Sequence, residues 1–482
     1  MNFTEDVLSS FPAARLAMVT VAEDGERREW GFGEVLTRSS GLAGALVARG
    51  VGRGDVVMTL IGNRPEWVLA MLACFRIGAV ALPCNTQLRR ADLAHRTAVS
   101  DPAIALGEAS LLAQLPDGVP CMDLAEIGAV LDEERPQEPP APAADLDPAD
   151  PALIVFTSGT TGPARAAVHP QRYLLGQQLQ AEHWFGAREG ELAWCTAASG
   201  WSKSARNAFI APWLAGAAAY LREGRFEPAE RLAICERERI NVLCQAPTEY
   251  RMLAKRTELR PVACLRRLVS AGEPLNAEVI SAFREGMGLD IHDGYGQTET
   301  GALTGALTGG EVRDGSMGLP LPGIELRIEE GELLLKTASC PTFFSRYIGS
   351  EPYAEEWWRT GDLVRADADG YLWFEGRSDD VILSSGYRIG PFEVESALIS
   401  HPAVSEAAAV AAPDPERGSV VRAVVVLRDG VPGDELAREL QDHVKRQTAP
   451  YKYPRIVDFA DSLPKTASGK IKRAELRAGG TT

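Results

Sequence analysis

The sequence predicts an α/β protein in which doubly wound βα sheets form a large N-terminal domain and a small α+β domain follows. Three observations predict this class. Short apolar runs alternate with helical patterns from residue 55, a second such series starts at Leu153, and the pattern changes after about residue 376. Alternation of this kind is typical of parallel sheets covered by helices. A chain of 482 residues can also bury more than one core.

The first series lies between residues 55 and 106. Asp55–Leu60 and Ala79–Pro83 have the composition of buried strands, and Ala103–Leu106 is a third short apolar run. Pro65–Ile77 is predicted to be a helix, because proline is well tolerated in a first helical turn. Arg89–Val99 is predicted to be the next helix, which gives two consecutive βα units.

The second series has the same character and is joined to the first by a different kind of segment. Residues 133–151 are rich in proline and acidic residues, so we expect an exposed connection between two halves of one region. The predicted strands of the second series, after the one that starts at Leu153, are Leu192–Thr196, Ala217–Leu221, Val242–Gln245 and Leu268–Ser270.

The C-terminal hundred residues or so predict a separate small domain. Two helical patterns alternate there with β-rich runs, and no internal repeat is visible. The predicted helices are Pro391–Ser400 and Asp434–Lys445, and the predicted strands are Val381–Leu383, Val404–Ala411, Val420–Leu427 and Ile456–Phe459.

The net charge of -16 argues against a nucleic-acid partner, because binding to a phosphate backbone requires a basic face. Eight scattered cysteines without a CxxC pair indicate free thiols in a reducing compartment. The acidic N-terminus lacks an apolar segment typical of a signal peptide, and Trp67–Pro83 is too short to span a membrane. We therefore expect a soluble, cytoplasmic protein.

A glycine-rich segment follows the apolar run Leu153–Phe156 and ends near Arg165. Glycines allow the backbone to approach a polyphosphate, and hydroxyl groups donate further hydrogen bonds. The segment does not match GxxxxGK[ST], so a P-loop is excluded, whereas an ordinary surface loop is the competing interpretation. Its residues are all small, and they are Thr157, Ser158, Gly159, Thr160, Thr161 and Gly162.

A second polar segment follows Leu289–His292. A carboxylate beside threonines suits a hard cation and phosphate oxygens, although a polar β-turn would have the same composition. The segment consists of Asp293, Gly294, Tyr295, Gly296, Gln297, Thr298, Glu299 and Thr300.

Three further motifs lie in the last third of the chain. Asp362 is a natural acceptor for ribose hydroxyls, and Arg377 is a natural donor to sugar or phosphate. Ser384–Gly390 and the basic run Pro464–Arg473 follow. The basic run could equally be a solvated tail, as most charge runs are.

Taken together, in this order, these motifs resemble the adenylate-forming superfamily of acyl-CoA synthetases, luciferases and adenylation domains. The resemblance covers roughly residues 30–475 and is greatest to medium-chain acyl-CoA synthetases. The segments that carry this likeness are Trp194–Lys203, Tyr295–Gly301, Ser384–Leu398, Tyr451–Arg455 and Pro464–Lys470.

The resemblance implies an AMP-forming ligase that uses ATP, Mg²⁺ and coenzyme A to activate a carboxylic acid. It also implies a distorted β-barrel in the large domain, residues 1–378, and a mobile small domain, residues 379–482, that rotates about Asp379. The implied partners are these small molecules, and the resemblance is compatible with a homodimer.

The resemblance further implies a role for each motif. The loop Thr157–Gly162 with Arg165 would close over the β- and γ-phosphates, Thr298 would contact phosphate, and Glu299 would hold magnesium. Lys470 would contact the acid carboxylate and the α-phosphate. The remaining implied contacts are Gly272, Glu273, Pro274 and Asp293–Gln297 for adenine, Asp362 and Arg377 for ribose, Ser385 and Gly386 for coenzyme A, and Arg388 for bound nucleotide or coenzyme A.

The chain departs from the family pattern after Gly162. The family usually continues as Gly-x-Pro-Lys, whereas this chain has Ala164 and Arg165. Arginine keeps the charge of lysine without its shape. An enzyme that performs mainly the thioester-forming half-reaction is therefore an open alternative.

Two other functions compete. Loading of an α-amino acid onto a carrier protein is disfavoured, because no aspartate between Ala187 and Phe226 could pair with the substrate ammonium. A catalytically dead nucleotide sensor is disfavoured by the presence of Thr298, Glu299 and Lys470. A carrier-protein thiol as the acceptor of another acid stays open.

Gly296 and Trp201 are the predicted acyl-pocket residues. Acetate-specific relatives have a tryptophan at the position of Gly296, so the resemblance implies a larger pocket here. We expect a medium-chain, aromatic or alicyclic acid, since each added buried methylene contributes about 0.8 kcal/mol. Trp201 could instead be a core residue, and Gly296 could be required only by a turn.

Overall fold

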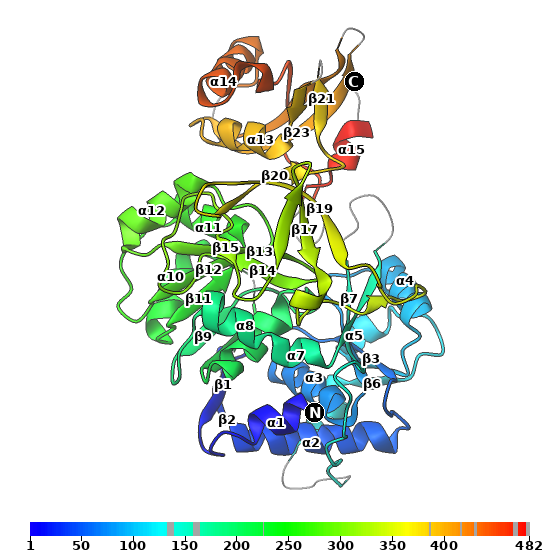
Figure 1. Ribbon diagram of the computed structural model, residues 1–482. Helices are drawn as coiled ribbons and strands as arrows, with labels where there is room; N and C mark the ends of the chain where they lie inside the picture. The colour runs from blue at the N-terminus through cyan, green and yellow to red at the C-terminus, as the bar shows by residue number, and fades with distance from the viewer. Residues whose placement is uncertain are drawn as a thin grey trace.

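The computed structural model describes residues 1–132, 139–157, 164–224, 226–384, 387–414, 417–428, 431–465 and 471–478. Within these ranges the chain forms a large α/β part and a smaller C-terminal part, which lies on top in Figure 1 with helices α13, α14 and α15. The predicted α/β class is confirmed.

The first large sheet contains the first predicted series. Among the described residues its order is β18-β8-β7-β4-β3-β5-β6, and β3 pairs in parallel with both β4 and β5. Its strands are β3 (Val56–Leu60), β4 (Val80–Pro83), β5 (Ile104–Gly107), β6 (Cys121–Asp123), β7 (Pro151–Phe156), β8 (Ala166–Pro170) and β18 (Arg346–Tyr347).

Helix α3 (Pro65–Ile77) is the most deeply buried helix of this region. Proline begins it, and Gly78 ends it with a φ of 74°, in the left-handed region. A Cβ atom on Gly78 would also lie 2.6 Å from Leu146, so both backbone conformation and packing require glycine there. The neighbouring helices are α1 (Phe3–Leu8), α2 (Phe32–Ala48), α4 (Arg90–Ser100), α5 (Ala109–Leu112) and α6 (Leu124–Leu131).

The connection between the two series is only partly as predicted. Residues 133–138 lie outside the described residues. Beyond them, Ala141 and Leu146 are buried, and the Ala144 N–H donates to the Arg76 carbonyl at 2.8 Å. The expectation of a wholly exposed connection is therefore wrong, because apolar residues within it pack on α2 and α3. Its ends do join one region, since Ala81 in β4 pairs with Leu153 in β7.

The second large sheet has the order β15-β14-β13-β12-β11-β9-β10-β1-β2 in the described part of the chain. The N-terminal strand β1 lies parallel to β10, with Met18 opposite Ala219. The strands are β1 (Leu16–Val21), β2 (Arg27–Gly31), β9 (Leu192–Cys195), β10 (Ala218–Arg222), β11 (Val242–Gln245), β12 (Arg267–Ala271), β13 (Ile291–Gln297), β14 (Gly301–Gly305) and β15 (Leu319–Pro320).

Helices connect the strands of this second sheet, and two of them contain π-helical turns. These turns are η1 (Ala181–Phe185) and η2 (Arg206–Ile210). The other helices are α7 (Arg172–Gly176), α8 (Gln178–Gln180), α9 (Ala211–Leu214), α10 (Pro228–Arg237), α11 (Pro247–Arg256) and α12 (Ala277–Met287).

A distorted β-barrel was expected within residues 1–378, and beside the two large sheets the described residues form a four-stranded antiparallel sheet, β16-β17-β19-β20. Its apolar face is built from Met317, Leu333, Val364 and Leu372, and Tyr295 of β13 packs against it. The strands are β16 (Leu326–Glu329), β17 (Glu332–Lys336), β19 (Trp357–Ala366) and β20 (Leu372–Arg377), and the short helix η3 (Thr337–Ser339) follows β17.

The C-terminal part has its own core and rests on β20. Phe392 packs on Phe374 of β20 with ring centroids 6.0 Å apart. The elements are β21 (Ile382–Ser384), β22 (Tyr387–Ile389), β23 (Val404–Asp414), β24 (Gly418–Leu427), β25 (Ile456–Phe459), α13 (Pro391–Ile399), α14 (Asp434–Gln447), η4 (Pro450–Lys452) and α15 (Arg473–Ala478). The strands and helices predicted for this part are confirmed within a few residues at their ends.

All eight cysteines have free thiols, as the sequence predicts. In the part of the chain that the structure describes, no helix combines the length and the apolar character that crossing a membrane requires.

We expect the free energy of unfolding to fall as the pH is lowered from 6.5 to about 4, and His292 to contribute to this fall. Burial, and then the Arg267 guanidinium, lower the pKa of His292 from 6.5 to about 4. In this window the unfolded chain binds a proton that the folded chain does not, so protons favour unfolding. Urea denaturation at several pH values should show a shallower fall for His292→Gln.

His183→Gln is the matched control, because His183 is a partly exposed histidine on η1. It should keep the wild-type pH dependence. An equal pH dependence in wild type and His292→Gln would contradict the assignment.

Candidate active site

Asp362 is the centre of a network at the end of β13. The β19–β20 register places it opposite Arg377, whose Nη1 lies 3.1 Å from one carboxylate oxygen. The Tyr295 hydroxyl and the Gln297 side-chain amide donate to the other oxygen at 2.5 and 2.7 Å. Burial, and then Asp362, raise the pKa of Tyr295, which keeps its hydroxyl protonated as a donor. These three donors fix the orientation of the carboxylate.

The Gln297 amide is itself held in one orientation. Its oxygen accepts a hydrogen bond from the Trp358 indole at 3.0 Å, and its nitrogen also donates to the Thr360 carbonyl at 2.7 Å. A side-chain amide with both ends bonded cannot turn. The end of β13 is thereby tied to β19.

A second network joins Glu299 to the base of the glycine-rich loop. The Tyr347 hydroxyl donates to Glu299 at 2.6 Å, and the Arg165 guanidinium lies over the Tyr347 ring, 3.4 Å from its centroid. Burial, and then the Glu299 charge, raise the pKa of Tyr347. Thr157 and Arg165 face each other across the loop, with a 2.8 Å backbone hydrogen bond. Ser158, Gly159, Thr160, Thr161 and Gly162 lie outside the described residues.

Glu299 fits the role of a magnesium ligand as a single carboxylate. Among the described residues no group of three acidic, histidine or cysteine side chains is placed to bind a metal ion. Magnesium commonly takes one or two protein carboxylates and completes its shell with water and substrate phosphates. Thr298 lies beside Glu299 in the turn between β13 and β14. A site of this kind requires a bound polyphosphate to be complete.

The predicted adenine-binding residues lie at the ends of β12 and β13. The Glu273 carboxylate is held by Arg251 and by Thr248, each at 2.8 Å, and Pro274 is next to it in sequence. Gly272 has a φ of 105°. Packing requires glycine at position 294, since a Cβ atom there would lie 2.5 Å from the Trp184 ring.

Asp293 is buried, and its Oδ1 atom has no hydrogen-bond partner in the protein. Burial raises the pKa of this carboxyl group. A buried oxygen without a partner fits a ligand that supplies an N–H donor. Lys203, to which the sequence analysis gave no role, contributes a positive charge near Asp293 and donates to the Ala271 carbonyl at 3.0 Å. Its position on a loop far from β13 in sequence explains why spacing did not identify it.

The presence of glycine at position 296 has a structural explanation that does not involve a substrate. A Cβ atom on Gly296 would lie 1.8 Å from the Gly301 carbonyl oxygen in the β13–β14 hairpin. The close approach of the two strands therefore requires glycine. Trp201 is partly buried in the turn before η2. The acyl-pocket role of both residues stays a prediction.

The C-terminal candidates are only partly described. Asp379 accepts a hydrogen bond from Arg377 at 3.2 Å and lies at the junction of the two parts. Arg388 lies in β22, but its side chain is not described, and Ser385, Gly386 and Lys470 lie outside the described residues. The basic run is not wholly a solvated tail, because Arg473 donates to both Glu395 oxygens at 2.8 and 2.9 Å.

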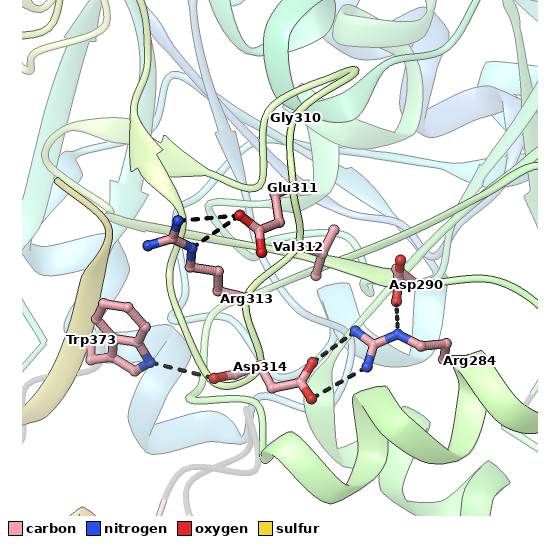
Figure 2. Close-up of a pocket in the computed structure, with 8 residues that line it drawn as sticks. All are labelled: Arg284, Asp290, Gly310, Glu311, Val312, Arg313, Asp314 and Trp373. Atoms are coloured by element: carbon pink, nitrogen blue, oxygen red, sulfur yellow. Dashed lines mark hydrogen bonds and ion pairs between the residues drawn. The ribbon is translucent and has the colours of Figure 1, made fainter. Parts of the chain in front are cut away.

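A surface depression of about 690 Å³ lies elsewhere, beside α12 and the loop after β14 (Figure 2). Its charges are paired with one another. Arg284 contacts Asp290 at 2.6 Å and Asp314 at 2.8 Å, and Arg313 contacts Glu311 at 3.2 Å. None of the predicted site residues lines this depression.

Family models match most of the chain. Residues 5–337 match the AMP-binding enzyme family, and residues 393–470 match the AMP-binding enzyme C-terminal domain. The chain is 37% identical to the uncharacterized acyl–CoA ligase YtcI of Bacillus subtilis, over 98% of this chain and 94% of the relative. It is 38% identical to the mitochondrial acyl-coenzyme A synthetase ACSM3 of Mus musculus, over 99% and 90% of the two chains.

Solved structures of the same kind superpose over nearly the full length. A benzoate CoA ligase from Burkholderia xenovorans LB400 gives a TM-score of 0.87 at 27% identity, covering 99% of this chain and 100% of that chain. The anthranilate CoA ligase AuaEII in complex with anthranoyl-AMP gives 0.87 at 29% identity, covering 99% and 97%.

We expect Asp362→Asn to weaken AMP binding about tenfold or more, because a hydrogen bond to a charged acceptor contributes about 1.5–3 kcal/mol. Calorimetric titration with AMP measures this change. Asp367→Asn is the control, since Asp367 pairs with Arg313 near the same strand pair, away from the site. Equal AMP affinity in the Asp362→Asn and wild-type proteins would exclude Asp362 from the nucleotide site.

Proposed function

The chain belongs to the AMP-binding enzyme family and is an AMP-forming acyl-CoA ligase, and from this premise we propose that its substrate is a medium-sized or bulky carboxylic acid. Acyl-CoA synthetases of this family use ATP, Mg²⁺ and coenzyme A. The reaction forms an acyl-adenylate from the acid and then transfers the acyl group to the coenzyme A thiol.

The position of two hydrogen-bonded networks next to each other supports the assignment of the nucleotide site. The Asp362 network and the Glu299–Tyr347–Arg165 network meet within one turn of chain, since Gln297 belongs to the first and Glu299 to the second. The first presents a carboxylate and a guanidinium, which suit ribose hydroxyls. The second presents a metal-binding carboxylate beside the loop proposed for phosphate. Together they support a nucleotide bound with its ribose near β19 and its phosphates near the loop.

In the first half-reaction a carboxylate oxygen of the acid attacks the α-phosphorus of ATP. A new P–O bond forms, the bond to the bridging oxygen breaks, and pyrophosphate leaves. We assign Lys470 to the acid carboxylate and the α-phosphate, and Thr298 to a phosphate oxygen. Glu299 would hold magnesium, which neutralises phosphate charge when it is bound. The adenine ring is assigned to Gly272–Pro274 and Asp293–Gln297.

In the second half-reaction the coenzyme A sulfur attacks the acyl carbon, and the bond to AMP breaks. No protein nucleophile is required. We propose that residues 379–482 rotate about Asp379 between the two steps, so that Gly386 and Arg388 replace Lys470 at the site. The 3.2 Å contact between Arg377 and Asp379 supports a coupling between ribose binding and this junction.

Arg165 supports a complete reaction over an enzyme restricted to thioester formation. Its guanidinium is held on the Tyr347 ring, which is in turn bonded to Glu299, so a positive charge is retained at the base of the loop. The thioester-only enzyme and a carrier-protein thiol as acceptor are the alternatives to this proposal.

Similarity to benzoate and anthranilate CoA ligases supports an acid larger than acetate. Gly296 gives weaker support than its sequence position suggested, because the β13–β14 hairpin requires glycine on its own account. A cytoplasmic location is proposed from a bacterial relative, although ACSM3 relatives are mitochondrial. The homodimer stays a prediction.

Pyrophosphate release measured across a panel of acids, with and without coenzyme A, tests the function. We expect hexanoate, benzoate or cyclohexane carboxylate to exceed acetate at least tenfold in kcat/KM, because each buried methylene contributes about 0.8 kcal/mol. Preference for acetate would overturn the acid class. Thioester formation from added acyl-adenylate and coenzyme A, without pyrophosphate release from ATP and any acid, would favour the thioester-only enzyme.

We expect Lys470→Ala to slow acyl-adenylate formation roughly a hundredfold or more, the scale for removal of one preorganised donor. Thioester formation from preformed acyl-adenylate should slow much less. Single-turnover assays of each half-reaction separate the two effects. Lys472→Ala is the control, because Lys472 pairs with Glu475 at the surface. Equal losses in both half-reactions would contradict the assignment of Lys470 to adenylation.

A further inference from the structure

We propose that the acid carries a second anionic group at its far end, a carboxylate in the simplest case, which Arg206 and His169 bind. This inference rests on the proposed function, because it names the class of acid for the same site. It starts from a group of buried polar side chains behind the β13–β14 hairpin, called here the interior polar cluster. Its members are His169, Tyr173, Gln177, Gln180, Arg206 and Asn207.

The interior polar cluster is deeply buried and incompletely paired. Arg206 is 5% exposed, and its Nε and Nη1 atoms have no hydrogen-bond partner. Both ring nitrogens of His169 also lack partners, as do one polar atom each of Gln177, Gln180 and Asn207. Few polar atoms stay unpaired inside a protein unless water, an ion or a ligand pairs with them. A group of unpaired polar atoms around a buried guanidinium fits a bound polar ligand.

Arg206 differs from the two other fully buried arginines of the described chain. Arg231 also has unpaired Nε and Nη1 atoms, but its Nη2 atom contacts the Glu249 carboxylate at 3.0 Å. Arg267 donates to the Trp184 carbonyl at 2.6 Å. No carboxylate forms an ion pair with Arg206 among the residues that the structure describes. An unpaired charge is costly to bury, so a carboxylate from outside the protein is its natural partner.

The local field also favours an anion. Burial, and then the charges of Arg206 and Arg172, lower the pKa of His169 to about 3. His169 is therefore neutral at physiological pH and can donate one N–H to an anion. Arg172 is held nearby, donating to the Phe343 carbonyl at 3.1 Å. Two guanidinium groups thus act on one buried position, with no negative side chain beside them in the described chain to balance the charge.

The position of Arg206 connects the interior polar cluster to the proposed acid site. Its Nη1 atom lies 3.5 Å from where a Cβ atom on Gly301 would be. Gly301 contacts Gly296 across the hairpin and follows Glu299 by two residues. Arg206 is also the first residue of the π-helical turn η2, and such turns are frequent at functional sites. An acid whose carboxylate is activated near Thr298 could therefore present its other end to Arg206.

The alternative is a purely structural role, in which buried waters or a chloride ion form hydrogen bonds with the interior polar cluster. A structural role and a substrate role make different predictions. A structural arginine would affect stability and all acids alike, whereas a substrate-binding arginine would distinguish acids with and without a second carboxylate.

The test compares acids of one skeleton: hexanoate with adipate, and benzoate with isophthalate and terephthalate. Pyrophosphate release by the wild-type enzyme should favour at least one diacid over its monoacid. Arg206→Met should lower kcat/KM for that diacid about thirtyfold or more, the scale for truncating one partner of a buried charge pair. The matched monoacid should change no more than about threefold. Arg206→Lys should retain part of the diacid preference.

Arg231→Met is the control, because Arg231 is equally buried but already has Glu249 as its partner. It should leave the ratio between diacid and monoacid unchanged. A melting curve provides a second readout, in which the preferred diacid stabilises the wild type but not Arg206→Met. Should Arg206→Met fail to fold, the inference is still tested by the preference of the wild type within each acid pair and by the diacid preference of Arg206→Lys.

Preference of the wild type for the monoacid in every pair would overturn the inference and leave the acyl-CoA ligase function intact. An unliganded Arg206→Met that melts several degrees lower with unchanged acid preference would assign the arginine to structure and also overturn it. Absence of pyrophosphate release with any acid would instead count against the proposed function. In that case diacid-dependent stabilisation of the wild type, lost in Arg206→Met, would still support the anion site.

Discussion

The orientation of one buried carboxylate, that of Asp362, determines how the parts of the candidate site are held together. Arg377, Tyr295 and Gln297 all donate to it, and they come from β20 and the end of β13. A buried carboxylate is costly unless hydrogen bonds replace its lost hydration. These bonds join β13 of the nine-stranded sheet to the four-stranded sheet of the described chain, and Arg377 continues the network to Asp379 at the junction with the C-terminal part.

The same principle organises the junction itself. Asp380 is buried and lies 2.7 Å from Arg477, while Glu395 accepts two hydrogen bonds from Arg473. These arginines belong to α15 (Arg473–Ala478). The contacts bind α15 to the start of the C-terminal part.

The interior of the protein shows two kinds of buried positive charge. Arg231 has the Glu249 carboxylate as a partner, and Arg267 donates to backbone carbonyls. Arg231 and Arg206 both have unpaired Nε and Nη1 atoms, but among the described residues no carboxylate lies in ion-pair contact with Arg206. Burying a charge without an opposite charge is costly, so the missing counter-charge, and not the unpaired donors alone, distinguishes Arg206.

The sequence by itself determined the βα series, the small C-terminal part and the motif residues, because apolar periodicity and turn chemistry are local properties. It also made Asp362, Arg377 and Glu299 candidate site residues by their chemical type. Only the tertiary structure decided that β1 pairs with β10, that residues 139–150 are partly buried, and that Gly296 is required by Gly301. It alone brought Tyr347 between Arg165 and Glu299, and Arg206 to His169. These contacts join residues far apart in the chain, and no local pattern of side chains records which distant surfaces will meet.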